Sequence, residues 1–341
     1  MFGNDISIDL GTATVLVYIK GRGIVLNEPT VIAVNTDTNE VAAVGSAALE
    51  MLGRTPPNIS AVRPLRDGVI SNYTLAQEMI RRLIGKVLRH LTGRPRIMMC
   101  VPSGITDVEQ RAVIDAAREV GAKDIYVIEE PVAAALGAGF DLSRAHGTMV
   151  IDIGGGTTDI AVMSLGGVVA SRSIKLAGDE FNEEIIRYMR REMNIQIGPR
   201  TAEKLKITDG GVLKRDKEIL CEAKGISSIT GIPKSVKVSS NDLYGIFDDF
   251  VYNITERARE VLEETPPELH SDIIGDGIVM TGGGSLIYGL DKRISEALGV
   301  KCFLAPDIDE CVVKGSGIAL DKIDHVTNPT EIYYKKAYIH E

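Results

Sequence analysis

The sequence lacks a basic excess, a long apolar run and any closely spaced pair of cysteines, and each absence removes a class of protein. Its 38 Lys and Arg residues are outnumbered by 47 Asp and Glu residues, which gives a net charge of −9. Because nucleic acids are bound through basic surfaces, this balance argues against nucleic acid as the main partner. It also argues against adhesion to anionic lipid by charge alone, although apolar insertion stays open.

No apolar run approaches the roughly 20 residues that span a bilayer. The first residues, Met1–Asp5, contain no basic region, so we expect neither a membrane span nor a signal peptide. The four cysteines, Cys100, Cys221, Cys302 and Cys311, form no CxxC pair, which favours small buried thiols in a reducing cytoplasm. What the chain does have is an ordinary globular composition, 44% hydrophobic and 25% charged, over 341 residues, enough for two domains.

The most informative feature is a motif that occurs twice. Ile8–Val17 reads IDLGTATVLV, and Ile151–Val162 reads IDIGGGTTDIAV. In both, an apolar strand ends in an Asp, a Gly/Thr turn follows, and a second apolar strand begins. Asp9 and Asp152 are 152 − 9 = 143 positions apart, far more than one repeat of a solenoid. We interpret the pair as a duplicated domain.

The two turns have the chemistry of phosphate loops. Glycine lets backbone N–H groups approach an anion without a Cβ between them, and the neighbouring threonines add hydroxyl donors. Two such turns facing each other would hold one phosphate chain from both sides. Asp9 and Asp152 would be repelled by phosphate, but they could orient the waters of an Mg²⁺ ion lying between. The alternative is that Asp-Gly turns merely close hairpins; two copies with the same flanking strands favour phosphate.

Three further motifs carry candidate chemistry. The run Gly282–Ser285 lies between an expected strand, Ile278–Thr281, and an expected helix, where it could wall a nucleotide or simply turn the chain. In Glu129–Pro131, a carboxylate at a strand end could orient or deprotonate a water, or could favour the helix dipole. Glu203 and Lys206 are one helical turn apart and could hold a ribose, although a solvated ion pair is the simpler interpretation.

Strand and helix signals alternate along the chain, which favours an α/β fold. A helix is expected over Leu75–Leu91, and a capping box at Thr106–Glu109 opens another. Pro131 would start a small-residue helix at its first turn. We expect a first lobe over 1–140, with an insertion at about 29–67 and completed by a helix at about 312–325; a second lobe over 141–311, with an insertion at about 177–250; and a tail over 326–341.

Taken together, these motifs resemble the superfamily of actin, sugar kinases and heat-shock chaperone ATPases. The resemblance runs from about residue 5 to about residue 325 and is greatest to the bacterial actin family MreB/Mbl. It is carried by Ile8–Ala13, Asn27–Pro29, Gly53–Pro56, Arg63–Ile70, Val101–Thr106, Glu129–Pro131, Asp152–Asp159, Arg200–Glu203, Thr265–Leu269 and Thr281–Gly284. It implies an actin-like fold of two duplicated lobes and four subdomains, each lobe a mixed sheet flanked by helices, with ATP and Mg²⁺ in the central cleft.

The resemblance also implies a weak ATPase with assigned residues. Glu130 would position the attacking water, Thr157 would lie near the γ-phosphate, and the helices after Pro131 and Gly315 would be the hinge between the lobes. Asp9 and Asp152 would hold Mg²⁺ through water. The implied nucleotide contacts are Gly11, Thr12, Ala13, Thr14, Gly154, Gly155, Gly156, Thr157, Glu203, Lys204, Leu205, Lys206, Gly282, Gly283, Gly284 and Ser285.

Members of the family polymerise head to tail into paired, antiparallel protofilaments at the inner face of the cell membrane, where they guide wall synthesis and set rod shape. The implied partners are therefore other copies of the chain, the inner membrane surface and cell-wall elongation proteins, in a cytoplasmic protein. One alternative is a sugar or acid kinase on the same fold, which would need a substrate pocket with an Asp base. A chaperone ATPase would need a separate peptide-binding domain, and only a short tail follows Leu320.

The chain departs from its relatives at three places that concern membranes. The N-terminus is too short for an amphipathic helix, and the loop His90–Pro95 has only Leu91 as a strongly apolar residue. The segment Ile332–Ile339 mixes aromatic and basic residues, as an interfacial anchor does. An unattached terminus is the interpretation that we favour for it.

Overall fold

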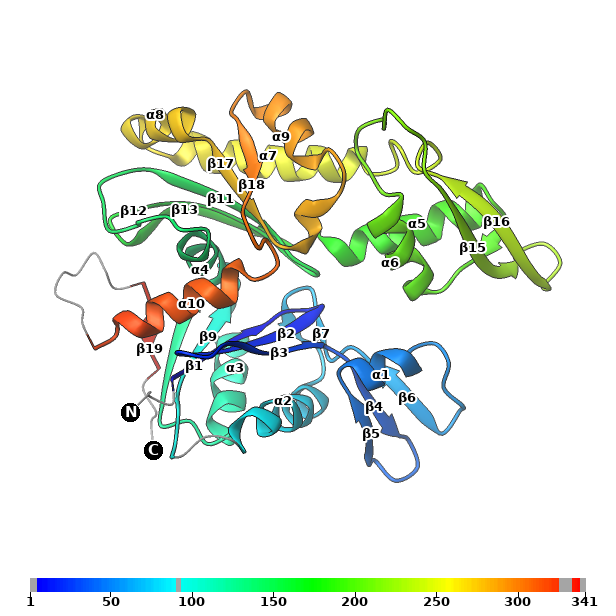
Figure 1. The fold of residues 1–341 in the computed structure, drawn as a ribbon, viewed down its shortest axis with the longest axis horizontal. Coiled ribbons are helices and arrows are strands. Elements are labelled where there is room, and N and C mark those ends of the chain that lie inside the picture. The colour runs from blue at the N-terminus through cyan, green and yellow to red at the C-terminus, as the bar shows by residue number, and fades with distance from the viewer. Residues whose placement is uncertain (1–4, 90–92, 325–332, 338–341) are drawn as a thin grey trace.

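The computed structural model describes residues 5–89, 93–324 and 333–337. Figure 1 shows two layers of sheet and helix, with α4 (Glu130–Gly137) and α10 (Cys311–Lys322) between them and smaller subdomains towards one end of the long axis. Leu91, the strongly apolar residue of the loop His90–Pro95, and the N-terminal residues 1–4 lie outside the described residues. In the part of the chain that the structure describes, no helix is both long and apolar enough to cross a membrane.

The first sheet has six strands in the order β19-β10-β9-β1-β2-β3. Its strands are β1 (Asp5–Leu10), β2 (Thr14–Ile19), β3 (Gly23–Pro29), β9 (Arg96–Val101), β10 (Asp124–Glu129) and β19 (Lys335–Lys336). The helices α2 (Tyr73–Leu88) and α3 (Asp107–Glu119) cover its outer face and enclose one apolar core with it. β1 runs antiparallel to β2 and parallel to β9.

The second sheet has five strands in the order β13-β12-β11-β17-β18. They are β11 (Thr148–Ile153), β12 (Thr158–Ser164), β13 (Gly167–Ile174), β17 (Ile278–Thr281) and β18 (Cys302–Leu304). The helices α7 (Asp248–Glu264), α8 (Pro267–Asp276) and α9 (Leu290–Leu298) pack against it. β11 runs antiparallel to β12 and parallel to β17, so this sheet repeats the plan of the first.

The repeated motif has the same strand register in both sheets. Ile6 pairs with Ile19 in the first sheet, and Met149 pairs with Val162 in the second, both displaced by 143 positions (149 − 6 and 162 − 19). All five residue pairs of the first hairpin recur at this displacement. The duplication seen in the sequence is therefore a duplication of strand pairing, down to the single residue that decides which face each side chain meets.

Each sheet carries an insertion. The first contains β4 (Ile32–Asn35), β5 (Val41–Val44), α1 (Ser46–Met51) and β6 (Ile59–Val62), followed by the small hairpin β7 (Leu65–Arg66) and β8 (Val69–Ile70). The second contains α5 (Gly178–Arg191), β14 (Ile195–Gln196), α6 (Pro199–Thr208), β15 (Leu220–Ser227) and β16 (Pro233–Ser239). We propose that the two sheets are the cores of the two predicted lobes, whose boundaries remain a prediction.

Several local predictions are confirmed. Thr106 and Glu109 form the capping box of α3, and Pro131 lies in the first turn of α4. The predicted helix over Leu75–Leu91 is α2, which Asn72 caps and which ends at Leu88. The prediction of an unattached tail is wrong for residues 333–337, because β19 pairs with β10.

The helices α4 and α10 cross at two glycines. A Cβ on Gly137 would overlap the carbonyl oxygen of Cys311, and a Cβ on Gly315 would overlap that of Ala133. The two backbones are therefore in direct contact. α4 follows a strand of the first sheet and packs on β11 and β12 of the second, whereas α10 follows the second sheet and packs on β1, β9 and β2 of the first. The two helices connect the layers crosswise.

Gly315→Ala should therefore destabilise the protein by about 2–3 kcal/mol, because the new methyl group displaces a helix backbone. The matched control is Gly85→Ala in α2, where a Cβ would meet nothing within 4 Å. That control should stabilise by about 0.5–1 kcal/mol, since alanine is the better helix former. Urea unfolding of both variants checks this. Equal effects of the two substitutions would contradict the close crossing.

Candidate functional site

The two Gly/Thr turns lie against each other. Both turns close through the same hydrogen bond: the Gly11 N–H donates to the Thr14 carbonyl at 3.0 Å, and the Gly154 N–H donates to the Thr157 carbonyl at 2.9 Å. A Cβ on Gly155 would lie 2.7 Å from the Cβ of Ala13. The predicted phosphate loops are thus brought together from opposite sheets, with room only for glycine where they meet.

The carbonyl oxygens of both turns are bound by protein donors. In the first turn, the Thr30 hydroxyl donates to the Gly11 carbonyl at 2.7 Å, the Thr30 N–H donates to the Ala13 carbonyl at 2.9 Å, and Arg63 reaches the Thr12 carbonyl. In the second, the first N–H groups of α5 donate to the carbonyls of Gly154 and Gly155 at 3.1 and 2.8 Å. Carbonyl oxygens would repel a phosphate, so their engagement elsewhere suits an anion site.

A third turn reaches the same place, and sequence reasoning missed it. Asp67 and Gly68 connect β7 to β8 with φ of 53° and 75°, as a two-residue hairpin turn with positive φ at both positions requires. The Gly68 N–H donates to the Thr12 hydroxyl at 3.0 Å, and a Cβ on Gly68 would lie 2.6 Å from Cγ2 of Thr157. This turn therefore touches both loops. The Asp-Gly pair was the available signal for the turn, but not for its destination.

Four carboxyl groups gather behind the loops. Burial raises the pKa of Asp9 and of Asp152 from 3.8 to about 7, and for Asp152 a hydrogen bond from the Thr281 hydroxyl at 2.7 Å opposes the rise. Burial also raises the pKa of Glu130 well above its ordinary value, and the charges of Asp159, Asp9 and Asp152 add to it. Burial raises the pKa of Asp159 too, although the hydrogen bond that it accepts from the Ser103 N–H at 3.0 Å opposes the rise.

Asp159 marks the difference between the two copies. It pairs across the hairpin with Asp152, and the equivalent position in the first copy is Leu16, opposite Asp9. The second loop thus carries an extra carboxyl group beside Glu130. Sequence reasoning included Asp159 in the repeated motif but gave it no role. The sequence did contain a signal for it: within the repeated motif, Asp159 is the acid whose counterpart 143 positions earlier, Leu16, is apolar.

The predicted adenosine contacts on α6 divide by their exposure. Lys206 donates to the Gly178 carbonyl and to Glu203, both at 2.9 Å, and Asn182 also donates to Glu203. The i,i+3 ion pair expected from the sequence is therefore present, with the Glu203 side chain 42% exposed, and the contacts with Gly178 and Asn182 add it to a network at the second loop. Leu205 is buried in the core and Lys204 is exposed to solvent, so a ligand beside α6 would meet the faces of Glu203 and Lys206.

The third glycine run packs on the second loop and does not open an α-helix as expected. Gly283–Leu286 forms only a short 3₁₀ turn, and α9 begins at Leu290. A Cβ on Gly282, whose φ is 78°, would lie 2.8 Å from Oδ1 of Asp152. The Ser285 hydroxyl donates to the Thr281 carbonyl at 2.6 Å. Gly282 and Gly284 are therefore required by close packing behind the second turn.

Two crosswise-connected sheets whose Gly/Thr turns face each other at their centre are the arrangement of the actin-like fold. Solved structures agree: MreB5 of Spiroplasma citri, crystallised with ADP, matches with a TM-score of 0.89 and 39% identity, covering 94% of this chain and 98% of that chain; the same protein has also been crystallised with AMPPNP. The profile of the MreB/Mbl protein family matches residues 3–328. The chain belongs to the MreB/Mbl family.

Curated relatives are similar over nearly their full lengths. The cell shape-determining protein Mbl of Bacillus subtilis is 46% identical over 325 residues, which is 95% of this chain and 98% of that protein. The cell shape-determining protein MreB of Escherichia coli is 45% identical over 330 residues, 95% of each chain. The predicted family is confirmed, and the alternative of a sugar or acid kinase finds no support in these matches.

The buried carboxyl groups predict how stability depends on pH in the ligand-free protein. A carboxyl group whose pKa is higher in the folded state than in the unfolded state binds more protons when folded, so stability falls as pH rises from about 4 to about 7. A rise of about 3 in pKa corresponds to up to about 4 kcal/mol per group. Asp152→Asn should remove a large part of this loss. Urea unfolding at pH 5 and pH 8 measures it.

The control for this experiment is Asp37→Asn, at an exposed position in the turn between β4 and β5. It should leave the pH dependence of the unfolding free energy as it is in the unchanged chain. If Asp152→Asn and Asp37→Asn gave the same pH dependence, the burial of Asp152 would not have the electrostatic cost that we assign to it.

Proposed function

We propose that this chain is an ATP-dependent, actin-like cytoskeletal protein that polymerises into filaments and guides cell-wall synthesis and cell shape. The observation that carries the proposal is the meeting of the two equivalent Gly/Thr turns, whose carbonyls are held by protein donors. The crystal structures of its Spiroplasma relative bound to ADP and to AMPPNP support the binding of a nucleotide. In this assignment, Gly11–Thr14 and Gly154–Thr157 hold the phosphates, and Glu203 and Lys206 lie beside the adenosine.

Mg²⁺ fits the electrostatics of the site. Asp9 and Asp152 are buried, and burial raises the pKa of both to about 7, which a divalent cation would reverse by favouring their charged forms. Among the described residues, no group of three or more His, Cys, Asp and Glu side chains could hold a metal ion directly. We therefore propose that Asp9 and Asp152 hold Mg²⁺ through water, where the ion would supply charge neutralisation for the phosphates.

Hydrolysis would rest on Glu130 and Thr157. Glu130 is in the first turn of α4, so helix geometry fixes the direction of its side chain beside the carboxyl cluster. From there it would orient the attacking water, with Thr157 next to the γ-phosphate. We propose a weak ATPase activity coupled to assembly.

The crosswise helices would link the nucleotide to the shape of the molecule. A phosphate chain held by both loops bridges the two sheets, and α4 and α10 are the continuous connections that pack between them. A ligand that binds the two loops more tightly in one arrangement will favour that arrangement. ATP and ADP would thus set different angles between the layers, with α4 and α10 as the hinge.

Self-assembly has a candidate surface at one end of the long axis. The hairpin of β15 and β16 lies there (Figure 1), and it exposes Ile226, Ile229 and Ile232, the last two at 75% and 61% in that order. Exposed apolar side chains grouped at a tip indicate an interface. A head-to-tail contact between unlike surfaces does not close and gives an open filament. The inner membrane surface and cell-wall elongation proteins remain proposed partners from family membership.

The proposed function predicts that the pure protein sediments with Mg-ATP and shows filaments by electron microscopy. Ile229→Asp should abolish sedimentation, because it places a charge in the apolar contact. Ile207→Asp is the matched control, an isoleucine of the same insertion that is 70% exposed on α6, and it should still sediment. A protein that binds ATP but forms no filaments, even on lipid vesicles, would overturn the cytoskeletal assignment.

Glu130→Gln should slow ATP hydrolysis by about 100-fold and leave ATP affinity nearly unchanged, because it removes the water-orienting charge but no phosphate contact. Glu129→Gln, one residue earlier in the chain, is the control and should stay within about twofold of the unchanged rate. Phosphate release and fluorescent-ATP titration measure the two quantities. Unchanged turnover in Glu130→Gln would remove Glu130 from its assigned role.

A further inference from the structure

The C-terminal segment 333–337 extends beyond the family match and is nevertheless built into the first sheet. The family profile ends at residue 328. β19 pairs antiparallel with β10, with Lys336 opposite Tyr126 and Lys335 opposite Val127. The Ala337 N–H donates to the Ile125 carbonyl at 2.9 Å and lengthens the contact by one residue. The edge of β10 is therefore covered by a strand from outside the matched region.

Side chains on both sides of this pairing make specific contacts. Tyr333 is 5% exposed and belongs to the apolar cluster between the two layers, which includes α4 and α10. Tyr334 meets Tyr126 edge to face, with ring centroids 5.3 Å apart and planes at 89°. Lys336 pairs with Asp124 at 2.8 Å, and this contact lowers the pKa of the Asp124 carboxyl group. Each of the three side chains, Tyr333, Tyr334 and Lys336, thus has a matching partner in the rest of the protein.

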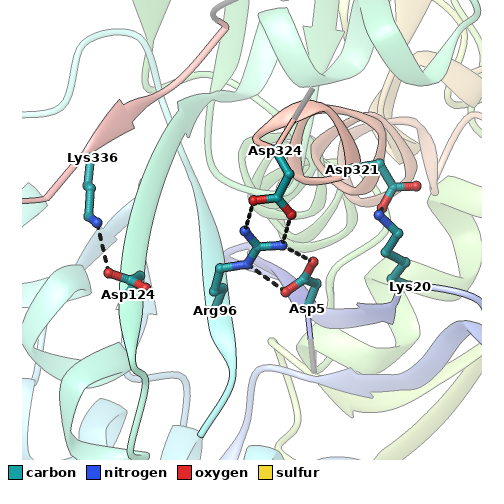
Figure 2. Close-up of polar contacts among 7 residues, drawn as sticks. All are labelled: Asp5, Lys20, Arg96, Asp124, Asp321, Asp324 and Lys336. Atoms are coloured by element: carbon teal, nitrogen blue, oxygen red, sulfur yellow. Dashed lines mark hydrogen bonds and ion pairs between the residues drawn. The ribbon is translucent and has the colours of Figure 1, made fainter. Parts of the chain in front are cut away.

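The end of α10 and the strands next to β10 are joined by contacts that do not involve residues 333–337. Figure 2 shows Arg96 between Asp5 and Asp324, which it binds at 2.6 Å each, so that the end of α10 is fixed to β1 and β9. Lys20, which follows β2, pairs with Asp321 of α10 at 3.1 Å in the same view. The end of α10 would therefore stay joined to β1 and β9, and β10 would keep its pairing with β9, if residues 333–337 left.

We propose that the β10 edge is a strand-binding site whose ligand is the C-terminal segment of this chain, bound within one molecule and exchangeable between two copies. Such sites bind an extended peptide through main-chain hydrogen bonds and select it through pockets for alternate side chains. Here the pairing of β19 with β10 supplies the main-chain hydrogen bonds. Tyr126, Asp124 and the interlayer cluster supply the contacts that select the side chains.

The contact is short, so we expect the segment to leave its own edge easily and to be able to bind the edge of a second copy. The strand is two residues long, and its ion pair joins side chains that are partly exposed, 47% for Lys336 and 24% for Asp124, where such pairs contribute little. A second copy offers an identical segment and an identical edge, so a swapped pair makes the same contacts as two separate molecules. Eight residues, 325–332, connect Asp324 to Tyr333, so these two residues can lie at most about 30–32 Å apart.

Charge exchange at position 336 tests the proposal with full-length chains, without nucleotide so that filaments do not interfere. In Lys336→Glu, the segment is repelled by its own Asp124; in Asp124→Lys, the edge is repelled by its own Lys336. When the two variants are mixed, each segment matches the other copy's edge. We expect analytical ultracentrifugation to show a mixed dimer that neither variant forms alone. A mixture that sediments as the sum of its parts would overturn the proposal.

A labelled peptide of residues 330–341 measures the site directly. It should bind full-length Lys336→Glu about fivefold or more tightly than the unchanged chain, whose own segment competes. Lys335→Glu is the matched control: it makes the same charge change one residue away, where alternation directs the side chain to the other face, and it should behave like the unchanged chain. Equal peptide binding by all three proteins would contradict a specific strand site, whatever the result of the ATP and sedimentation assays.

Discussion

The close crossing of α4 and α10 is the constraint on which the arrangement of the molecule depends. Each helix leaves one sheet and packs on the other, and Gly137 and Gly315 let the two backbones touch. α4 begins directly after β10, and α10 follows β18 after a connection over residues 305–310. The same two helices hold together the sheets whose Gly/Thr turns meet. A larger side chain at the crossing would separate the layers and, with them, the phosphate loops.

The cost of this geometry is electrostatic. Bringing the strand ends together buries Asp9, Asp152, Asp159 and Glu130, and burial raises the pKa of all four. A buried acid cluster is least stable when charged and unaccompanied. The ligand-free protein is therefore strained in the region where a cation and a phosphate chain would bind. Ligand binding would relieve that strain and join the layers at once, which couples occupancy to shape through one set of residues.

Local and repeated features could be predicted from the sequence, and long-range contacts could not. The repeated turn, the capping box at Thr106 and the helix at Pro131 each depend on residues within a few positions of one another. The contact of Gly68 with Thr12 joins residues 56 positions apart, and no local pattern specifies where a tight hairpin will dock. The docking of Lys336 on β10 was missed for the same reason, since a two-residue strand leaves no periodicity to detect.

The two copies of the motif have diverged in a way that separates their tasks. The first loop offers the Thr12 hydroxyl to the Gly68 N–H and has Leu16 opposite Asp9, so its extra contact is a neutral one to the β7–β8 turn. The second loop has Asp159 opposite Asp152 and lies beside Glu130, so it carries the additional charge. In the proposed function, a duplicated hairpin with identical register would supply one side for holding the phosphate chain and one side for acting on it. The symmetry of the backbone would let both sides reach the ligand, and the single exchange of an apolar residue for an acid, Leu16 against Asp159, would give the chemistry to only one of them.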